Sequence, residues 1–256
     1  MPYQTLHVRA EPDVLWITID RPEQQNAING TLLAELQAAL DQAEKLLSCR
    51  LVVIQGRPGV FCTGMDFADA TSSPENVAAR GGAEFFGLLK RLTAIPRVVV
   101  SVVDGRAAGG GVGIAAASDL VYATPRSTFS LPEALWGLLP CCVLPFLIRR
   151  VGFQPASAMS LSTMPVTAEQ AHQAHLADQL AEKPELLIRR LRQRVSKLDD
   201  GTIAAMKRYL RQLWFLSEEM EHAAVGEFTR LMSSPVVRER ISGFATSQVF
   251  PWESRT

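Results

Sequence analysis

Residues 107–120, "AAGGGVGIAAASDL", place three consecutive glycines ahead of small apolar side chains, and no charged group follows until Asp119. A Gly-rich turn that opens a helix leaves backbone N–H groups free to bind whatever lies above them. The stretch lacks the Lys-Ser/Thr pair of a phosphate-binding loop and the later acid of a dinucleotide site. An oxyanion held by two converging N–H donors fits better. The alternative is that the glycines only let a helix and a strand pack closely.

Apolar runs and helix-like periodicity extend on both sides of this stretch. We expect strands at 14–20, 50–56, 97–105 and 119–124, and helices at 31–47, at 84–94 and over most of the chain after residue 144. Thr31 is the expected cap of the first helix, and the polar segment 71–84 is expected to be mobile. Strand–loop–helix units followed by helices predict an α/β fold with a helical C-terminal region.

The composition is that of an ordinary globular protein, with 47% hydrophobic and 20% charged residues in 256. Lys plus Arg and Asp plus Glu are both 26, so the net charge favours neither nucleic acid nor an acidic membrane. The first residues lack the layout of a signal peptide, and apolar runs stop short of the roughly 18 residues of a membrane span. Four cysteines without paired spacing predict a reduced, cytoplasmic protein.

Four motifs follow one another along nearly the whole chain: "IDRPEQQNAIN" (19–29), "VFCTGMDF" (60–67), "VDGRAAGGGVGIAAASDLV" (103–121) and "FSLPEALWGLLP" (129–140). Together they resemble the crotonase superfamily of enoyl-CoA hydratases and isomerases. The resemblance implies repeated ββα units in a spiral core over residues 1–195, with a C-terminal helical region at 196–256 for trimerisation. It also implies a homotrimer or a dimer of trimers.

The same resemblance implies a thioester site that needs no metal or other cofactor. The substrate would be carried on the phosphopantetheine of coenzyme A or of an acyl carrier protein. The backbone N–H groups of Cys62 and Gly110 would stabilise an enolate, each donor contributing about 3 kcal/mol to lowering the barrier. Gly109, Asp66 and Trp136 would contact the substrate.

Hydratases of this family usually carry two glutamates, and only one is present here. Gly113 stands where the first would lie, whereas Glu133 in "LPEAL" is kept. One carboxyl suffices for elimination on a single face, because it can take the C2 proton and then hand a proton to the departing hydroxyl. The apolar neighbours of Glu133 are expected to raise its pKa for this task. The alternative is an acid placed at a helix N-terminus for the dipole alone.

Two segments narrow the resemblance. "FSLPEALWGLLPCCVLPFLIRRVG" (129–152) and "VFPWES" (249–254) resemble the dehydratases of polyketide β-branching cassettes. That branch implies a lyase that converts 3-hydroxy-3-methylglutaryl-acyl carrier protein to 3-methylglutaconyl-acyl carrier protein. Alternatives are a hydratase, isomerase or decarboxylase acting on coenzyme A thioesters, and a non-catalytic thioester- or RNA-binding member. The bulky "LPCCVLPFL" is expected to narrow and dry the acyl end of the pocket.

Other polar residues receive lesser roles. Arg80 or Lys90 is the expected partner of the substrate's distal carboxylate. Asp66 and Asp69 are candidate auxiliary acids, and Asp119 is expected to be structural. No metal site is expected, because His172 and His175 lack a third ligand. Basic residues of the segment 184–211 are a possible docking face for an acidic carrier protein: Arg189, Arg190, Arg192, Arg194, Lys197, Lys207, Arg208 and Arg211.

Overall fold

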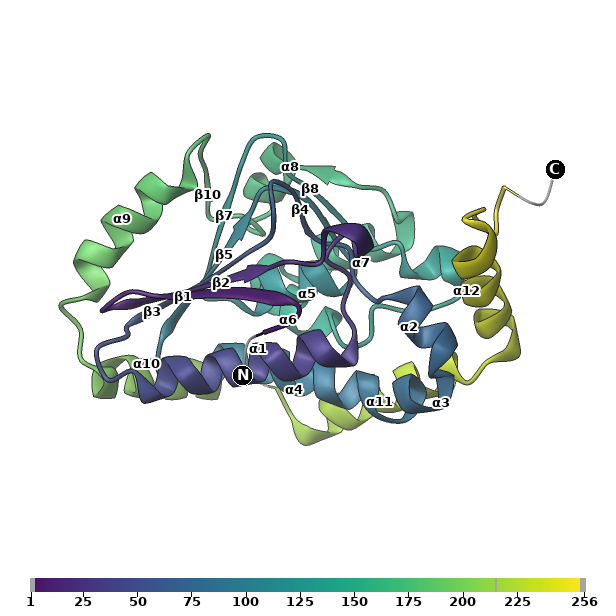
Figure 1. Ribbon diagram of the computed structural model, residues 1–256, viewed down its shortest axis with the longest axis horizontal. Coiled ribbons are helices and arrows are strands. Elements are labelled where there is room, and N and C mark those ends of the chain that lie inside the picture. Colours follow the sequence, from purple (N-terminus) through teal and green to yellow (C-terminus); the bar gives the residue numbers. More distant parts are fainter. Residues whose placement is uncertain (1–2, 215, 254–256) are drawn as a thin grey trace.

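Two β-sheets form the centre of the computed structural model, which describes residues 3–214 and 216–253 (Figure 1). Within these residues the larger sheet has six strands in the order β1-β2-β3-β5-β7-β10, and the smaller has four in the order β4-β6-β8-β9. The larger sheet comprises β1 (Leu6–Ala10), β2 (Val14–Ile19), β3 (Leu51–Gln55), β5 (Val98–Val103), β7 (Leu120–Ala123) and β10 (Gln179–Leu180). The smaller comprises β4 (Gly59–Cys62), β6 (Gly105–Ala108), β8 (Thr128–Ser130) and β9 (Val166–Thr167).

The chain winds through both sheets in successive turns. In the pairs β3/β4, β5/β6 and β7/β8, the first strand joins the larger sheet and the second joins the smaller. Strands of successive turns pair in parallel, whereas β1/β2 and β8/β9 are antiparallel. Parallel strands are covered on both faces, which explains why β5 reads "VVVSVV" and is almost wholly buried. The expected crotonase spiral of ββα units is confirmed.

Helices cover these sheets and fill the C-terminal half. The α-helices are α1 (Gly30–Lys45), α2 (Phe67–Ser72), α3 (Pro74–Asn76), α4 (Gly82–Ala94), α5 (Gly110–Ala117), α6 (Leu144–Val151), α7 (Phe153–Ser162), α8 (Ala168–Gln173), α9 (Pro184–Val195), α10 (Asp200–Leu213), α11 (Glu218–Met232) and α12 (Pro235–Ser247). Shorter turns are η1 (Pro22–Gln24), the π-helical η2 (Val77–Gly81) and η3 (Glu133–Trp136). No helix in the described part of the chain is long and apolar enough to cross a membrane.

One local expectation was wrong. Asn29 rather than Thr31 caps α1, because its side chain accepts a hydrogen bond from the N–H of Leu32 at 2.9 Å. The segment 71–84 runs through the end of α2, α3, η2 and the start of α4, and its mobility stays a prediction. Pro74 lies at the first position of α3, where its missing N–H costs no hydrogen bond.

The C-terminal helices pack on the rest of the chain. Helices α10 and α11 contact α4, and α12 contacts α2 and η3. Lys207 of α10 is buried, and its ammonium donates to the carbonyl of Arg97 at 2.8 Å and to the carboxylate of Asp119 at 2.6 Å. Asp119 also accepts from the N–H of Val99 at 2.8 Å, so this acid is structural, as expected. Residues 196–253 therefore share their packing with residues 1–195, and trimerisation through them stays a prediction.

Candidate active site

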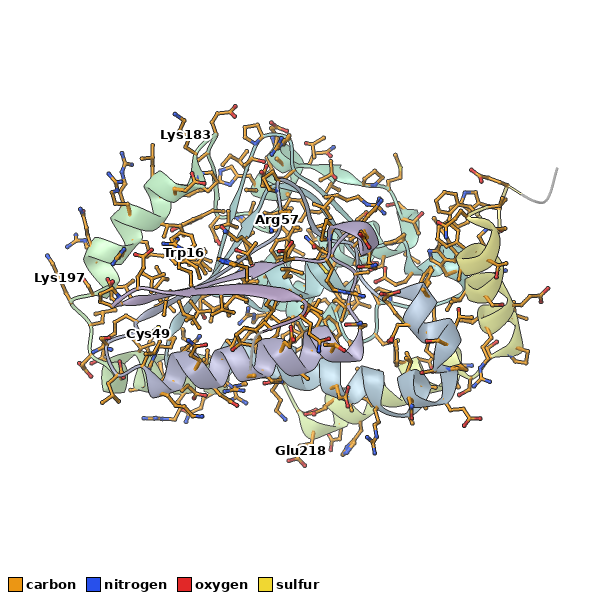
Figure 2. The ribbon with its side chains drawn as sticks, in the orientation of Figure 1. Trp16, Cys49, Arg57, Lys183, Lys197 and Glu218 are labelled. Atoms are coloured by element: carbon orange, nitrogen blue, oxygen red, sulfur yellow. The ribbon has the colours of Figure 1, made fainter. Side chains whose placement is uncertain are left out.

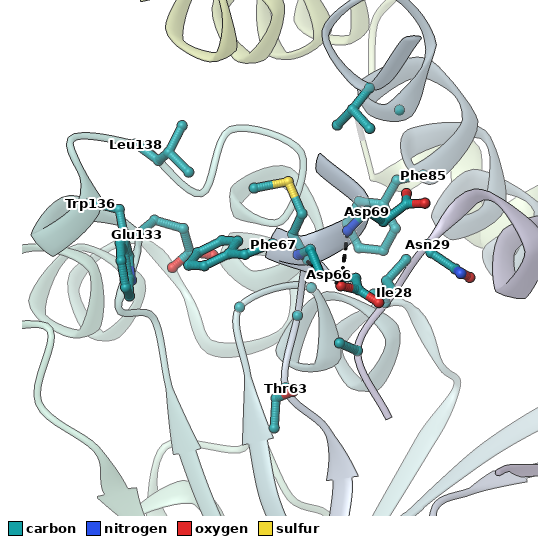
Figure 3. Close-up of a pocket in the computed structure, with 18 of the residues that line it drawn as sticks. Ile28, Asn29, Thr63, Asp66, Phe67, Asp69, Phe85, Glu133, Trp136 and Leu138 are labelled. Atoms are coloured by element: carbon teal, nitrogen blue, oxygen red, sulfur yellow. Dashed lines mark hydrogen bonds between the residues drawn. The ribbon is translucent and has the colours of Figure 1, made fainter. Parts of the chain in front are cut away.

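A cavity of about 960 Å³ lies at the end of the molecule formed by α2, α3 and α12 (Figures 1 and 3). Its wall comes from five parts of the chain: the segment after η1, the segment from Thr63 to Phe85, the glycines that open α5, the segment 132–143, and residues of α11, α12 and the segment after α12. Figure 3 shows Glu133 and Trp136 on one side of the cavity and Asp69 and Phe85 on the other.

Two glycine turns meet at the floor of this cavity. Gly64 and Gly109 have φ values of 88° and 52°, which L side chains rarely adopt. A Cβ at Gly64 would lie 3.2 Å from the amide nitrogen of Gly110, and a Cβ at Gly109 would lie 3.1 Å from Oε1 of Glu133. Glycine is thus required where the two turns and the carboxyl approach one another. Gly110 begins α5, so its N–H has no acceptor within the helix.

The backbone N–H that can face the cavity beside that of Gly110 is the one of Met65 rather than that of Cys62. The N–H of Ile28 donates to the carbonyl of Gly64 at 2.7 Å, and the N–H of Asp66 donates to the carbonyl of Ile28 at 2.9 Å. These two bonds form a parallel bridge, in which the peptide groups on either side of Met65 bond to Ile28 and the N–H of the bridged residue itself is turned to the other side. The N–H of Met65 therefore points away from Ile28, toward the side on which β4 pairs with β6, and Met65 lines the cavity.

Cys62 lies behind this wall. It is fully buried among the described residues and is not part of the cavity lining, and its thiol accepts a hydrogen bond from the N–H of Gly64. Burial raises the pKa of this thiol to about 12, so it stays protonated at neutral pH. The structure therefore places Met65 and Gly110, not Cys62 and Gly110, where two N–H groups can reach a ligand in the cavity.

Glu133 is the first residue of η3 and directs its carboxyl toward Gly109. Its Oε2 is shielded from solvent and has no hydrogen-bond partner among the described residues. Burial raises the pKa of Glu133 to about 7, against the smaller lowering effect of its own backbone N–H. A carboxyl that is half ionised near neutral pH can both accept and return a proton, as expected from the sequence.

Apolar side chains occupy the space around Gly113, where the family's other glutamate would lie. A Cβ there would meet Val143 at 3.0 Å, Phe85 at 3.1 Å and Leu89 at 3.3 Å. Burial raises the pKa of Cys142, which also lines the cavity, to about 12. The side chains in contact with this position are therefore uncharged, and no glutamate stands where the family's other one would lie.

The two aspartates that line the cavity differ in their contacts, and a role of Asp69 as an auxiliary acid stays a prediction. Asp66 caps α2 by accepting from the N–H groups of Ala68 and Asp69, and it forms a buried ion pair with Arg21 at 2.8 Å. These contacts make it an anchor of the Met65 turn rather than a proton carrier. The pKa of Asp69 is raised, mainly by burial and further by the charge of Asp66, and its carboxylate accepts from the N–H of Gly30.

The two basic candidates for the substrate's carboxylate differ in position. Arg80 lines the cavity and is exposed at its mouth. Lys90 does not line the cavity, and its ammonium pairs with Glu221 of α11 at 2.6 Å. Arg80 therefore stays a candidate partner of the substrate's carboxylate, whereas Lys90 does not.

The basic face on α9 and α10 lies away from the cavity. Helix α9 is at the opposite end of the molecule from α2 and α12, and Figure 2 shows Lys183 and Lys197, which flank it, on the outer surface there. Arg192 of α9 pairs with Glu11 and Asp13. These residues therefore do not flank the mouth of their own chain's cavity.

The histidine pair does not form a metal centre. Nδ1 of His172 is hydrogen-bonded to the carbonyl of Ala177 at 2.8 Å. Across residues 3–214 and 216–253, no three His, Cys, Asp or Glu side chains are placed to hold a metal ion.

Comparisons with known proteins agree with this geometry. The enoyl-CoA hydratase/isomerase family model matches residues 9–255. Bacillaene synthase dehydratase PksH of Bacillus subtilis is 34% identical over 255 residues, 99% of this chain and 98% of PksH. A crystal structure of PksH superposes with a TM-score of 0.90 at 34% identity, covering 98% of this chain and 100% of that one.

The names of two further relatives describe them as hydratases of coenzyme A thioesters. The 2,3-dehydroadipyl-CoA hydratase of Escherichia coli K12 is 35% identical over 172 residues, 67% of each chain. Mevalonyl-coenzyme A hydratase sidH of Aspergillus fumigatus is 27% identical over 252 residues, 94% of this chain and 92% of sidH. Since the family model spans almost the whole chain and the spiral fold is present, this protein belongs to the enoyl-CoA hydratase/isomerase family.

Proposed function

We propose that the chain is a dehydratase that removes water from a 3-hydroxy-3-methylglutaryl thioester on an acyl carrier protein, giving the 3-methylglutaconyl thioester. The observation that carries this proposal is the lone Glu133: a shielded carboxyl with a pKa raised to about 7, opposite two backbone N–H groups. At Gly113, where the family's other glutamate would lie, the contacts are apolar.

In the proposed reaction, the thioester carbonyl accepts hydrogen bonds from the N–H groups of Gly110 and Met65. The carboxylate of Glu133 takes the C2 proton, and the electron pair of the C2–H bond moves into the enolate, whose oxygen these N–H groups stabilise. The enolate then expels the C3 hydroxyl as the C2–C3 double bond forms. Glu133 hands its proton to that departing oxygen, so water leaves and the carboxylate is restored. One acid serves both steps because both groups leave on the same face.

The relatives support both halves of the proposed acyl group. A mevalonyl thioester carries a hydroxyl and a methyl group on C3, and a dehydroadipyl thioester carries a free carboxylate at its far end. The proposed substrate combines these features. Arg80 is the proposed partner of its carboxylate, because a guanidinium matches a carboxylate with paired hydrogen bonds.

Delivery by a carrier protein is proposed from the likeness to PksH, whose name describes it as the dehydratase of bacillaene synthase. We do not propose α9 as the docking face for the cavity of its own chain, because it lies at the far end of the molecule (Figure 1).

The test is to incubate the protein with carrier-bound 3-hydroxy-3-methylglutaryl and weigh the product. Loss of water with the wild type, but not with Glu133→Gln, supports the proposal. Loss of carbon dioxide would favour the decarboxylase alternative, and an unchanged mass would favour a non-catalytic thioester-binding protein. The same acyl group on coenzyme A separates the two modes of delivery, since carrier delivery predicts the larger kcat/KM with the carrier.

A further inference from the structure

The turn that bears Glu133 also bears Trp136. In a 3-10 helix the side chains of residues three apart stand on the same side, and η3 spans Glu133 to Trp136. The turn is closed by the N–H of Leu138, which donates to the carbonyl of Glu133 at 3.0 Å. Among the described residues Oε2 has no hydrogen-bond partner, and the hydrogen bond that acts on the carboxyl comes from the backbone N–H of Glu133 itself, so its position depends on the backbone of the turn.

Trp136 is the centre of an aromatic cluster, defined here as Phe67, Trp136, Phe244, Phe250 and Trp252. Its ring centroid lies 4.6 Å from that of Phe67, 5.1 Å from Phe244, 5.4 Å from Trp252 and 6.1 Å from Phe250. Phe250 also stacks on Phe244 at 4.9 Å and on Trp252 at 4.8 Å. Three of the five rings thus come from α12 and the segment that follows it.

We propose that the C-terminal members of the aromatic cluster are positioning residues for Glu133: they fix Trp136, and through the shared turn they hold the carboxyl against Gly109 and keep water from it. This inference rests on the proposed function only in taking Glu133 as the proton carrier. Phe244 and Phe250 also form part of the cavity wall. The same side chains therefore fix Trp136 and cover the cavity.

Three titratable or charged groups lie on the elements packed around Glu133. The Cys141 thiol interacts with the charge of Glu133, and the guanidinium of Arg240 lies beside Gly137 at the end of η3. Asp66, the cap of α2, is paired with Arg21. Burial is the largest cause of the raised pKa of Glu133. Loosening the cover therefore admits water and lowers that pKa toward the value of an exposed glutamate.

Trp252 allows the cleanest test, because it contacts Trp136 and Phe250 but does not line the cavity. Trp252→Ala is expected to lower the pKa of Glu133 by about one unit and kcat by about tenfold, with KM changed less than about twofold. Trp252→Phe should restore most of both, since it keeps a ring in place. Val249→Ala is the matched control, because Val249 is 46% exposed in the same segment.

The pKa is measured without substrate, by NMR titration of ¹³C-labelled glutamate carboxyls, with the Glu133 signal identified from its absence in Glu133→Gln. If the proposed function is wrong, no variant turns over the substrate, but the titration still measures how the cluster affects the pKa of Glu133. The two failures can therefore be told apart. If Trp252→Ala titrates and turns over like the wild type, or if Val249→Ala changes as much, the inference is overturned.

Discussion

Replacing Glu133 by glutamine is expected to stabilise the folded chain above neutral pH. The pKa of Glu133 is about 7 in the folded protein and 4.5 for the ordinary side chain, so the folded state binds the proton more tightly. Wild-type stability therefore falls as pH rises from about 4.5 to about 7, and this loss is complete above both values. Glutamine carries no charge to bury and escapes this cost.

The size of the effect follows from the same two pKa values. A difference of one in pKa between the folded and unfolded protein corresponds to about 1.4 kcal/mol, which gives about 3 kcal/mol in total and about 2 to 3 kcal/mol between pH 5 and pH 8.5. The free energy of unfolding of Glu133→Gln relative to wild type should rise by that amount across this interval. Any constant cost of an unpaired amide cancels in the difference between the two pH values.

Urea unfolding at fixed protein concentration measures this difference. The exposed Glu239→Gln on α12 is the control, and its difference from wild type should stay nearly constant with pH. A difference for Glu133→Gln that is equally constant from pH 5 to pH 8.5 would refute a shielded carboxyl with a raised pKa.

Three further predictions concern activity. Glu133→Gln should lower dehydration turnover by about 10²- to 10⁴-fold, and a variant that keeps more than a tenth of wild-type turnover would contradict the mechanism. The kcat/KM of the wild type should rise with pH through about 7 as the carboxylate of Glu133 forms. Gly113→Glu alone should destabilise the chain by about 1–3 kcal/mol, because its Cβ meets Phe85 at 3.1 Å, and should not raise hydration of a straight-chain enoyl thioester. Combined with Phe85→Ala it should raise that hydration, measured by loss of enoyl absorbance. Arg80→Leu should raise KM for the diacid thioester about tenfold or more and leave a neutral 3-hydroxyacyl thioester nearly unaffected, and equal effects on both would exclude the ion pair.

Four strands of the larger sheet and the main helices could be predicted from the sequence because their signals are local. Val-rich runs bounded by Gly and Pro mark buried strands, and β2, β3, β5 and β7 begin and end within two residues of the expected positions. Strands β1, β4, β6, β9 and β10 were not predicted, because they are two to five residues long and lack such a run. The short helical turns of the segment 71–84 could not be predicted because its composition is polar, whereas Pro74 at the first position of α3 and the contacts of α2 with α12 stabilise them.

Those parts of the site that have local sequence signals could also be predicted. Glu133 and Gly110 could be placed from motifs, but the second donor could not, because the direction of the Met65 N–H depends on pairing with Ile28, distant in sequence. The glycine at position 64, whose φ is positive in the structure, is the local sequence feature that marks the turn between β4 and Met65. Lys90 was misplaced because its partner, Glu221, lies in a helix far along the chain.

The packing of α12 against its own chain's α2 has a consequence for how such a protein can change over evolution. The carboxyl of Glu133 and the side chains of α12 that form part of the same cavity wall lie on one polypeptide, so by the inference above substitutions near the C-terminus would change the pKa of Glu133 while the spiral core stays the same. In an assembly of several copies, each catalytic pocket would carry these side chains with it. Subunits could then diverge in proton affinity one at a time, without a compensating change in a neighbour.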